Sequence, residues 1–119
     1  MDGQLNLFMF VTPEEEDMSK PLYERITDKD ELAIAEKIQQ RRLQILVHSY
    51  LYYQVDTNIV DDNTWATWGK ELVSLQEQYP EIAKRVIYHK EFANFDPSTG
   101  QGLPYNDKRI VNIAKRLMK

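Results

Sequence analysis

Residues 50–82 have the sequence YLYYQVDTNIVDDNTWATWGKELVSLQEQYPEI, and this stretch decides the fold. It opens on an aromatic cluster, crosses a short polar segment at 55–61 and then becomes regularly apolar. Asp61 or Asp62 can cap a helix there, because a carboxylate accepts hydrogen bonds from the free amides of a first helical turn. The apolar positions that follow are spaced by three and four residues, as on one face of a helix: Trp65, Trp68, Leu72, Leu75 and Tyr79.

A long helix is predicted before this segment, from near Asp28 to about Gln54. Thr27 or Asp28 can cap it, and acidic residues crowd its first turn, where the helix dipole favours them. Arg41 and Arg42 stand where its apolar stripe is weakest. That stripe recurs at three- and four-residue steps: Leu32, Ala35, Ile38, Ile45, Leu46 and Tyr53. The two helices should form an antiparallel hairpin.

The rest of the chain predicts shorter helices. Pro80 suits the first turn of a helix, so 81–87 is expected to be a short one. A turn-rich loop at 95–104 follows, and Asn106 or Asp107 caps a last helix. The apolar face of that helix is made of Ile110, Ile113, Ala114 and Leu117.

The expected fold class is therefore all-α. Residues 22–119 should form one domain, a helical hairpin with the C-terminal helix packed across both of its helices. Residues 1–21 differ in composition, with an apolar run and then an acidic stretch, and are expected to form an extended N-terminal tail.

The composition is that of a globular protein, with 119 residues, 42% of them hydrophobic and 29% charged. The net charge of -4 argues against direct nucleic-acid binding, because binding phosphates needs a basic surface. The sequence has no cysteine, which excludes disulfides and thiolate zinc sites. A chain without cysteine suits the reducing cytoplasm, where we expect this protein to be located. No apolar run reaches the roughly 20 residues of a membrane span, and no signal-peptide pattern opens the chain.

Charge is unevenly spread along the chain. Residues 1–31 hold nine acidic and three basic residues, whereas residues 84–119 hold eight basic and three acidic ones. The basic C-terminal third is interpreted either as a solvated helix face or as a surface for phosphates or an acidic partner.

The order of features over residues 40–85 resembles the small N-terminal domain of bacterial NAD-dependent DNA ligases. An aromatic cluster, an aspartate, a short loop, an aspartate-capped amphipathic helix and a Pro-Glu-Ile ending follow one another. The resemblance implies a helical hairpin that holds the nicotinamide mononucleotide half of NAD during self-adenylation. Such chemistry suits these residue types, since aromatic faces and carboxylates both attract a flat cationic ring.

Carried over residue by residue, the resemblance implies a nucleotide-binding site. Tyr52 matches the first contact tyrosine of the family, and Tyr53 stands where the family has His or Tyr. Asp62 matches the aspartate that opens the second helix. Trp65 replaces a tyrosine, and Ala66 replaces a second aspartate, so one carboxylate is gone. The alternative is that the aromatic residues only pack the hairpin and that Asp62 is only a helix cap.

No catalytic set accompanies this hairpin. The adenylation motif of the ligases, Lys-x-Asp-Gly, is absent from the sequence, and so is their tetra-cysteine zinc site. His48 and His89 are the only histidines and lack the spacing of metal ligands. We therefore expect a protein that is not an enzyme and has no metal and no cofactor, apart from the NAD or nicotinamide mononucleotide that the resemblance implies.

The N-terminal residues Gln4, Leu5, Asn6, Leu7 and Phe8 resemble the short peptide with which bacterial replication and repair proteins dock on the sliding clamp. In that interpretation Gln4, Leu5, Leu7 and Phe8 bind the partner, with Leu7 and Phe8 as apolar anchors. The alternative rests on the alternation of Leu5, Leu7, Met9 and Val11, which suits an extended segment packed on the helices.

Three functional hypotheses follow. The first is a non-enzymatic accessory protein of a phage or mobile element that binds host DNA-metabolism machinery of the sliding-clamp type, in the bacterial cytoplasm. The second is an inhibitor of a host nuclease or defence complex, of the anti-CRISPR type, whose acidic stretch Glu14–Asp17 imitates nucleic acid. The third is a module that binds NAD or nicotinamide mononucleotide.

Overall fold

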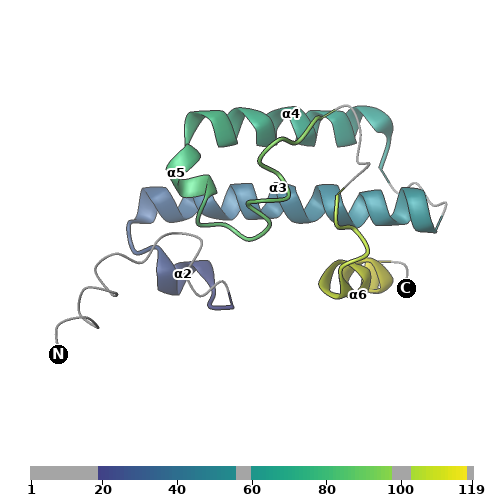
Figure 1. Cartoon of the computed structure of the whole chain (residues 1–119), viewed down its shortest axis with the longest axis horizontal. Helices are drawn as coiled ribbons and strands as arrows, with labels where there is room; N and C mark the ends of the chain where they lie inside the picture. The colour runs from purple at the N-terminus through teal and green to yellow at the C-terminus, as the bar shows by residue number, and fades with distance from the viewer. Residues whose placement is uncertain (1–18, 56–59, 98–102, 118–119) are drawn as a thin grey trace.

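The structure is a computed structural model, and it describes residues 19–55, 60–97 and 103–117 (Figure 1). The described residues form helices and no strand, which confirms the predicted all-α class. The helices are α2 (Leu22–Arg25), α3 (Lys29–Gln54), α4 (Asp62–Gln78), α5 (Pro80–Ala83) and α6 (Lys108–Leu117). Of these described helices, none is long and apolar enough to cross a membrane.

The central element is α3, which matches the predicted long helix. Its N-cap is Asp28, whose carboxylate accepts a hydrogen bond from the Glu31 amide at 3.0 Å. The predicted stripe is buried at four positions: Ala35, Ile38, Ile45 and Leu46. Tyr53 is an exception, being 38% exposed. Arg42 is the opposite exception, since only 1% of it is exposed although its charge suggested a surface position.

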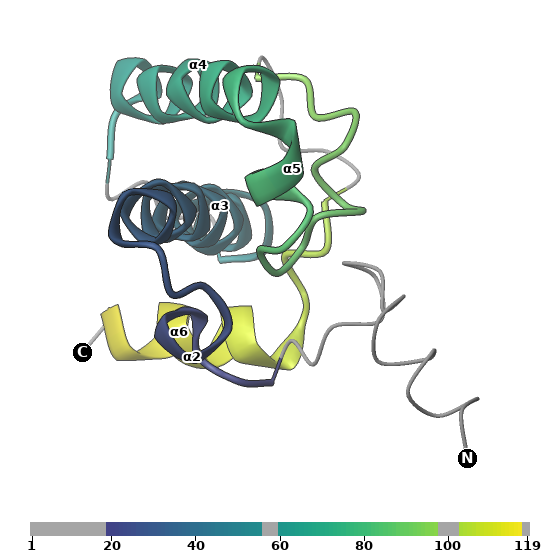
Figure 2. The same ribbon diagram turned by 90° about the vertical axis from the view of Figure 1, so that its left-hand side faces the viewer.

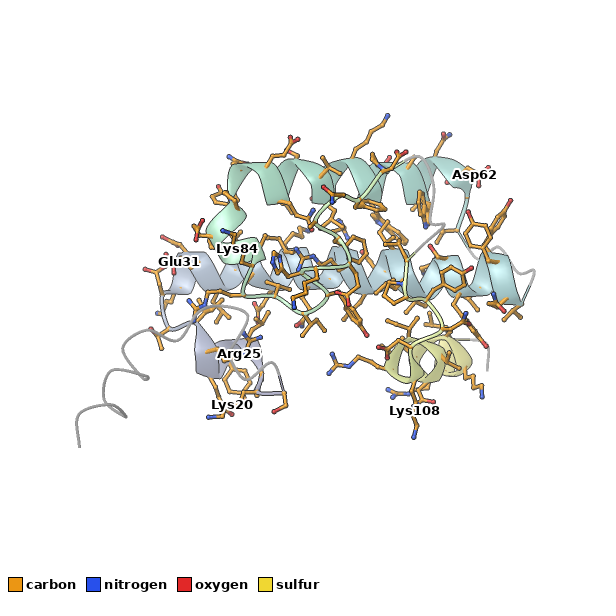
Figure 3. The ribbon with its side chains drawn as sticks, viewed as in Figure 1. Lys20, Arg25, Glu31, Asp62, Lys84 and Lys108 are labelled. Atoms are coloured by element: carbon orange, nitrogen blue, oxygen red, sulfur yellow. The ribbon has the colours of Figure 1, made fainter. Side chains whose placement is uncertain are left out.

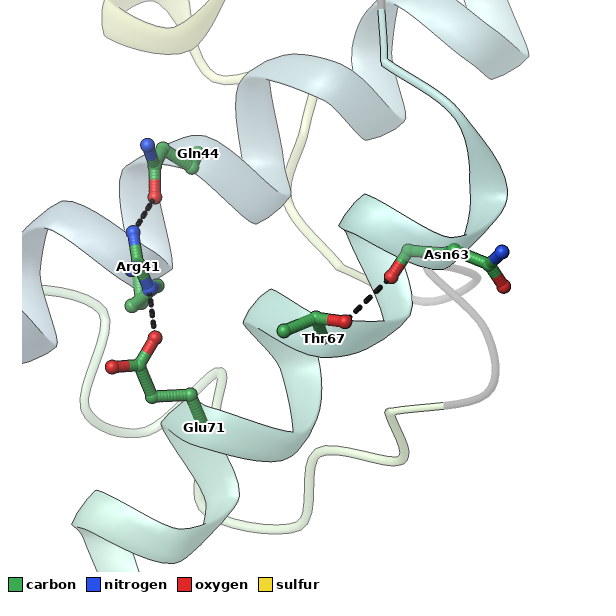
Figure 4. Close-up of polar contacts among 5 residues, drawn as sticks. All are labelled: Arg41, Gln44, Asn63, Thr67 and Glu71. Carbon is green, nitrogen blue, oxygen red and sulfur yellow. Dashed lines mark hydrogen bonds and ion pairs between the residues drawn. The ribbon is translucent and has the colours of Figure 1, made fainter.

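Helix α4 runs back along α3 and completes the predicted hairpin (Figure 1). Its N-cap is Asp61, which accepts a hydrogen bond from the Thr64 amide at 2.7 Å, and Asp62 is the first helical residue. Across the hairpin, Arg41 Nε lies 2.6 Å from Glu71 Oε1 (Figure 4). Figure 4 also shows Thr67 bonded to the Asn63 carbonyl within α4, and Gln44 bonded to the same arginine.

Helix α5 begins at Pro80 as predicted but ends at Ala83, so the helix expected over 81–87 is too long. After it, Arg85 and Val86 make three-residue turns, with amides bonded to the carbonyls of Ile82 and Ala83. Arg42 holds this irregular segment against α3, because its Nη1 donates hydrogen bonds to the carbonyl oxygens of Ala83, the last residue of α5, and of Val86 and Ile87 beyond it.

Helices α2 and α6 lie on the side of α3 opposite α4 (Figure 2). Helix α6 packs on α3 through Ile110 and Ala114, both buried, and within the described ranges it does not contact α4. The predicted packing across both hairpin helices is therefore wrong. The reason is that the segment after α5 already covers α4, where Phe95 packs on the Trp65 ring and Pro97 approaches Gly69.

Candidate functional site

The residues of the predicted nucleotide site lie at one end of the hairpin. Tyr52 and Tyr53 belong to the last turn of α3, and Asp62 and Trp65 belong to the first turn of α4. The two turns are neighbours because α4 folds back directly along α3, and Figure 3 labels Asp62 at this end. We call these four residues the hairpin tip.

The two tyrosines of the tip face solvent rather than the core. Tyr52 is 54% exposed, Tyr53 is 38% exposed, and their rings meet edge to face with centroids 5.0 Å apart. Neither tyrosine is part of the buried core, although their edge-to-face contact is itself a packing contact at the end of α3. Neighbouring aromatic side chains left open to solvent form a surface that can receive a ligand.

A third tyrosine joins this surface from outside the hairpin. The ring of Tyr105, in the segment that leads into α6, stacks on the ring of Tyr53 with centroids 5.5 Å apart and 21° between the planes. Reasoning from sequence missed Tyr105, because a residue in an irregular loop has no periodic pattern to mark it. Its aromatic character was the one available signal.

Trp65 combines packing with partial exposure. It is half-buried, and its ring meets Phe95 at 6.3 Å in an edge-to-face arrangement, while Phe95 in turn meets Phe92 at 5.0 Å. Trp65 therefore packs on the segment after α5 while part of the residue stays accessible.

Asp61, the N-cap of α4, and Asp62, a residue of the hairpin tip, are adjacent in sequence but have different roles. Asp61 makes the helix cap, and its hydrogen bonds from the Thr64 amide and hydroxyl lower the pKa of its carboxyl below the usual 3.8. Asp62 is exposed and takes no part in that cap. Its charge can therefore act on a ligand at no cost to the start of α4.

His48 lies on α3 one turn before Tyr52. Its ring meets the Trp68 ring at 5.3 Å, and its Nδ1 is buried with no hydrogen-bond partner in the described part of the chain. Burial lowers the pKa of His48 below 6.5. His48 is therefore a packed side chain on α3. In the described ranges, no three His, Asp or Glu side chains come together as a metal site.

The other predicted binding residues cannot be placed in this site. Gln4, Leu5, Leu7 and Phe8 lie outside the described residues, as does the acidic stretch Glu14–Asp17.

The comparisons with known proteins agree with the hairpin. Residues 31–85 match a family model described as "DNA ligase-like, N-terminal NAD+-binding domain". The chain is similar to the DNA ligase of Petrotoga mobilis, with 28% identity over an alignment of 97 residues that covers 72% of this chain and 14% of the ligase. It is also similar to the DNA ligase of Carboxydothermus hydrogenoformans, with 35% identity over 53 residues, which are 44% of this chain and 8% of the ligase. The chain thus spans only a small part of the curated relatives it matches. No solved structure matches it significantly.

Proposed function

Through residues 31–85 this chain is related to the N-terminal domain of NAD-dependent DNA ligases, and we propose that its hairpin tip binds a nicotinamide nucleotide, the mononucleotide half of NAD. The observation that supports this most directly is the exposure of Tyr52 and Tyr53 in the last turn of α3, at the end of the hairpin where the exposed Asp62 begins α4. The tip residues lie inside the matched range, whereas Tyr105 lies beyond it.

The proposed binding rests on charge and ring stacking. The nicotinamide ring carries a positive charge, which the faces of Tyr52 and Tyr53 attract and which the Asp62 carboxylate balances. Tyr105 holds the Tyr53 ring in place by stacking on it. Each exposed cation–π contact contributes about 0.5–1 kcal/mol. With no carboxylate at Ala66, we expect weak binding, with a Kd of about 1 mM.

We propose binding without catalysis. The Lys-x-Asp-Gly motif that accepts the adenylate in the ligases is absent from this sequence. The tip supplies aromatic faces and the Asp62 carboxylate, which can hold and release a nucleotide, and it has no lysine of the kind that accepts the adenylate in the ligases.

Titration with nicotinamide mononucleotide tests this proposal, with the unfolding temperature and tryptophan fluorescence as readouts. Tyr52→Ala and Asp62→Ala should each weaken binding. Tyr23→Ala is the matched control, because Tyr23 is a 65% exposed tyrosine on α2, away from the tip. The reduced nucleotide, whose ring has no charge, should bind more weakly. No response at millimolar nucleotide, or equal losses in Tyr52→Ala and Tyr23→Ala, would rule the proposal out.

A second function is proposed on sequence alone. The run Gln4-Leu5-Asn6-Leu7-Phe8 fits a peptide that docks on a bacterial sliding clamp, with Leu7 and Phe8 as its anchors. Capture of purified clamp should be lost in Leu7→Ala/Phe8→Ala and kept in Asn6→Ala, which changes the variable position of the motif. Equal capture by all three proteins would contradict this assignment.

A further inference from the structure

Helix α6 carries all of its charge on one arc of its surface. Its exposed basic residues are Lys108, Arg109, Lys115 and Arg116, which we call the α6 basic face. At 100° per residue these four positions fall within about 120° of the helix circumference. The opposite side carries the buried residue Ile110, which packs on α3.

The charge of this face is not offset within the helix. Lys108–Leu117 contains four basic residues and no acidic one, so the helix has a charge of +4 in a chain whose net charge is -4. Within the described residues, the ion pairs Arg41–Glu71 and Lys84–Glu81 both lie outside α6. The acid that precedes α6, Asp107, accepts a hydrogen bond from the Arg109 amide at 2.8 Å and also bonds Tyr88.

The face is also accessible. Helix α6 lies on the side of α3 opposite α4, and Figure 3 shows Lys108 on the side of α6 that points away from α3. Next to it, Arg109 and Lys20 line a common cavity of about 440 Å³, which extends the positive surface toward α2. Glu36 is the acidic residue in the lining of that cavity.

The spacing of the charges suits a regularly charged polymer. Lys108 and Arg109 form one pair, and Lys115 and Arg116 form a second pair seven residues later, which is about 10.5 Å along the helix axis. One strand of duplex DNA advances about 3.4 Å per phosphate, so the two pairs match phosphates about three steps apart. The face has no aromatic residue on which a base could stack, so it is suited to backbone contacts only.

We propose that the α6 basic face binds the phosphate backbone of a nucleic acid without regard to base sequence. The net charge of -4 argued against nucleic-acid binding. A net charge sums the acidic and basic segments of the chain, so it does not show the local positive charge of α6. This proposal does not depend on nucleotide binding at the hairpin tip, since α6 lies outside residues 31–85. Four phosphate contacts give a slope of about −3.6 for log K against log salt concentration.

Fluorescence anisotropy with a labelled DNA duplex of arbitrary sequence, at several salt concentrations, tests the proposal. Lys115→Gln/Arg116→Gln should weaken binding by about tenfold or more at low salt and make the salt slope shallower by about 2. The control is Lys37→Gln/Lys70→Gln, which removes the same charge from exposed positions on α3 and α4. It should change the affinity by less than about twofold.

The same anisotropy measurement distinguishes a nucleic-acid partner from an acidic protein partner. Polyglutamate of matched length is added as a competitor, because an acidic protein is the other partner that a basic helix fits. Weak competition supports the nucleic acid. Competition as strong as that of unlabelled DNA overturns the assignment, and so does an equal loss in both double variants. Urea unfolding of each variant verifies that the fold is kept.

Discussion

Arg42 on α3 donates a hydrogen bond from Nη1 to the carbonyl oxygen of Val86, at 2.9 Å and across 44 residues of sequence. The same atom reaches the carbonyl oxygens of Ala83 and Ile87, and Nε bonds Gln76 on α4 at 2.9 Å. Burial lowers the pKa of Arg42 to about 10, so the side chain remains a cation at neutral pH. One buried charge thus joins both hairpin helices to the segment after α5.

Arg42→Met should destabilise the protein strongly. The methionine fills part of the space but leaves several carbonyl oxygens and the Gln76 side chain without their donor. Each buried group left unsatisfied costs about 1–3 kcal/mol, so we expect the free energy of unfolding to fall by about 3 kcal/mol or more. Urea denaturation measures it.

Arg41→Met is the matched control, one residue earlier in the same helix. Arg41 pairs with Glu71, and the two side chains are 14% and 37% exposed. Water still reaches this pair, so we expect a smaller loss than for Arg42→Met, about 1 kcal/mol. Equal losses for the two variants would show that the buried arginine has no special structural role.

Substitution of Asp61 should mainly affect the stability of the fold, whereas substitution of Asp62 should mainly affect nucleotide binding. Asp61→Ala removes the cap of α4 and should lower the urea midpoint of unfolding, whereas Asp62→Ala removes only a first-turn charge and should lower it much less. Because hydrogen bonds lower the pKa of Asp61, its stabilising effect should be present above pH 3.8 and be lost as the pH falls further. Loss of stability in Asp62→Ala alone would mean that the cap is assigned to the wrong residue.

Gly69→Ala should disturb the segment that covers α4. A Cβ at this position would lie 3.0 Å from Pro97 Cβ and 3.3 Å from Pro97 Cα, so the segment must move away. Alanine favours a helix over glycine by about 1 kcal/mol, but overpacking costs about 1–3 kcal/mol, so a net loss of stability is expected. The near-ultraviolet circular dichroism of Trp65 and Phe95 should change. Ser74→Ala, on the exposed side of α4, should have little effect on either measurement.

His48 should make stability depend on pH. Burial lowers its pKa in the folded chain below 6.5, so the unfolded chain binds the proton first as the pH falls. The stabilising effect is therefore complete well above pH 6.5 and decreases below it. His48→Phe should flatten the dependence of the urea midpoint on pH between neutral and about pH 5. His89→Gln controls for the loss of a histidine elsewhere, and an identical response of the two variants would contradict the assignment.

Interactions between residues close together in the sequence were enough to predict much of this fold. The cap at Asp28, the buried stripe of α3 and the start of α5 at Pro80 each depend on a few neighbouring residues, and all three are confirmed. Two expectations failed at helix ends. Tyr53 and Leu117 fit an apolar face by spacing, but they stand in the last turns of α3 and α6 and are 38% and 51% exposed.

Tertiary contacts could not be predicted in this way. Nothing in the periodicity marks Arg42 as buried, since its acceptors are carbonyl oxygens more than 40 residues away. The residues of the hairpin tip came from a family resemblance, and the structure brings them to one end of the hairpin. Tyr105 was missed because its partner, Tyr53, lies on another element.

The family match ends at residue 85, but the core continues past it. Val86, Phe92 and Ile110 are completely buried, and two of the carbonyl oxygens held by Arg42 belong to residues 86 and 87. Residues 31–85 therefore contain Arg42 and two of its acceptors, the Gln76 side chain and the Ala83 carbonyl, but not the carbonyls of Val86 and Ile87. A fragment that ends at residue 85 would keep the buried cation and lose part of the hydrogen bonding that compensates its burial, so the matched segment is not a self-sufficient folding unit.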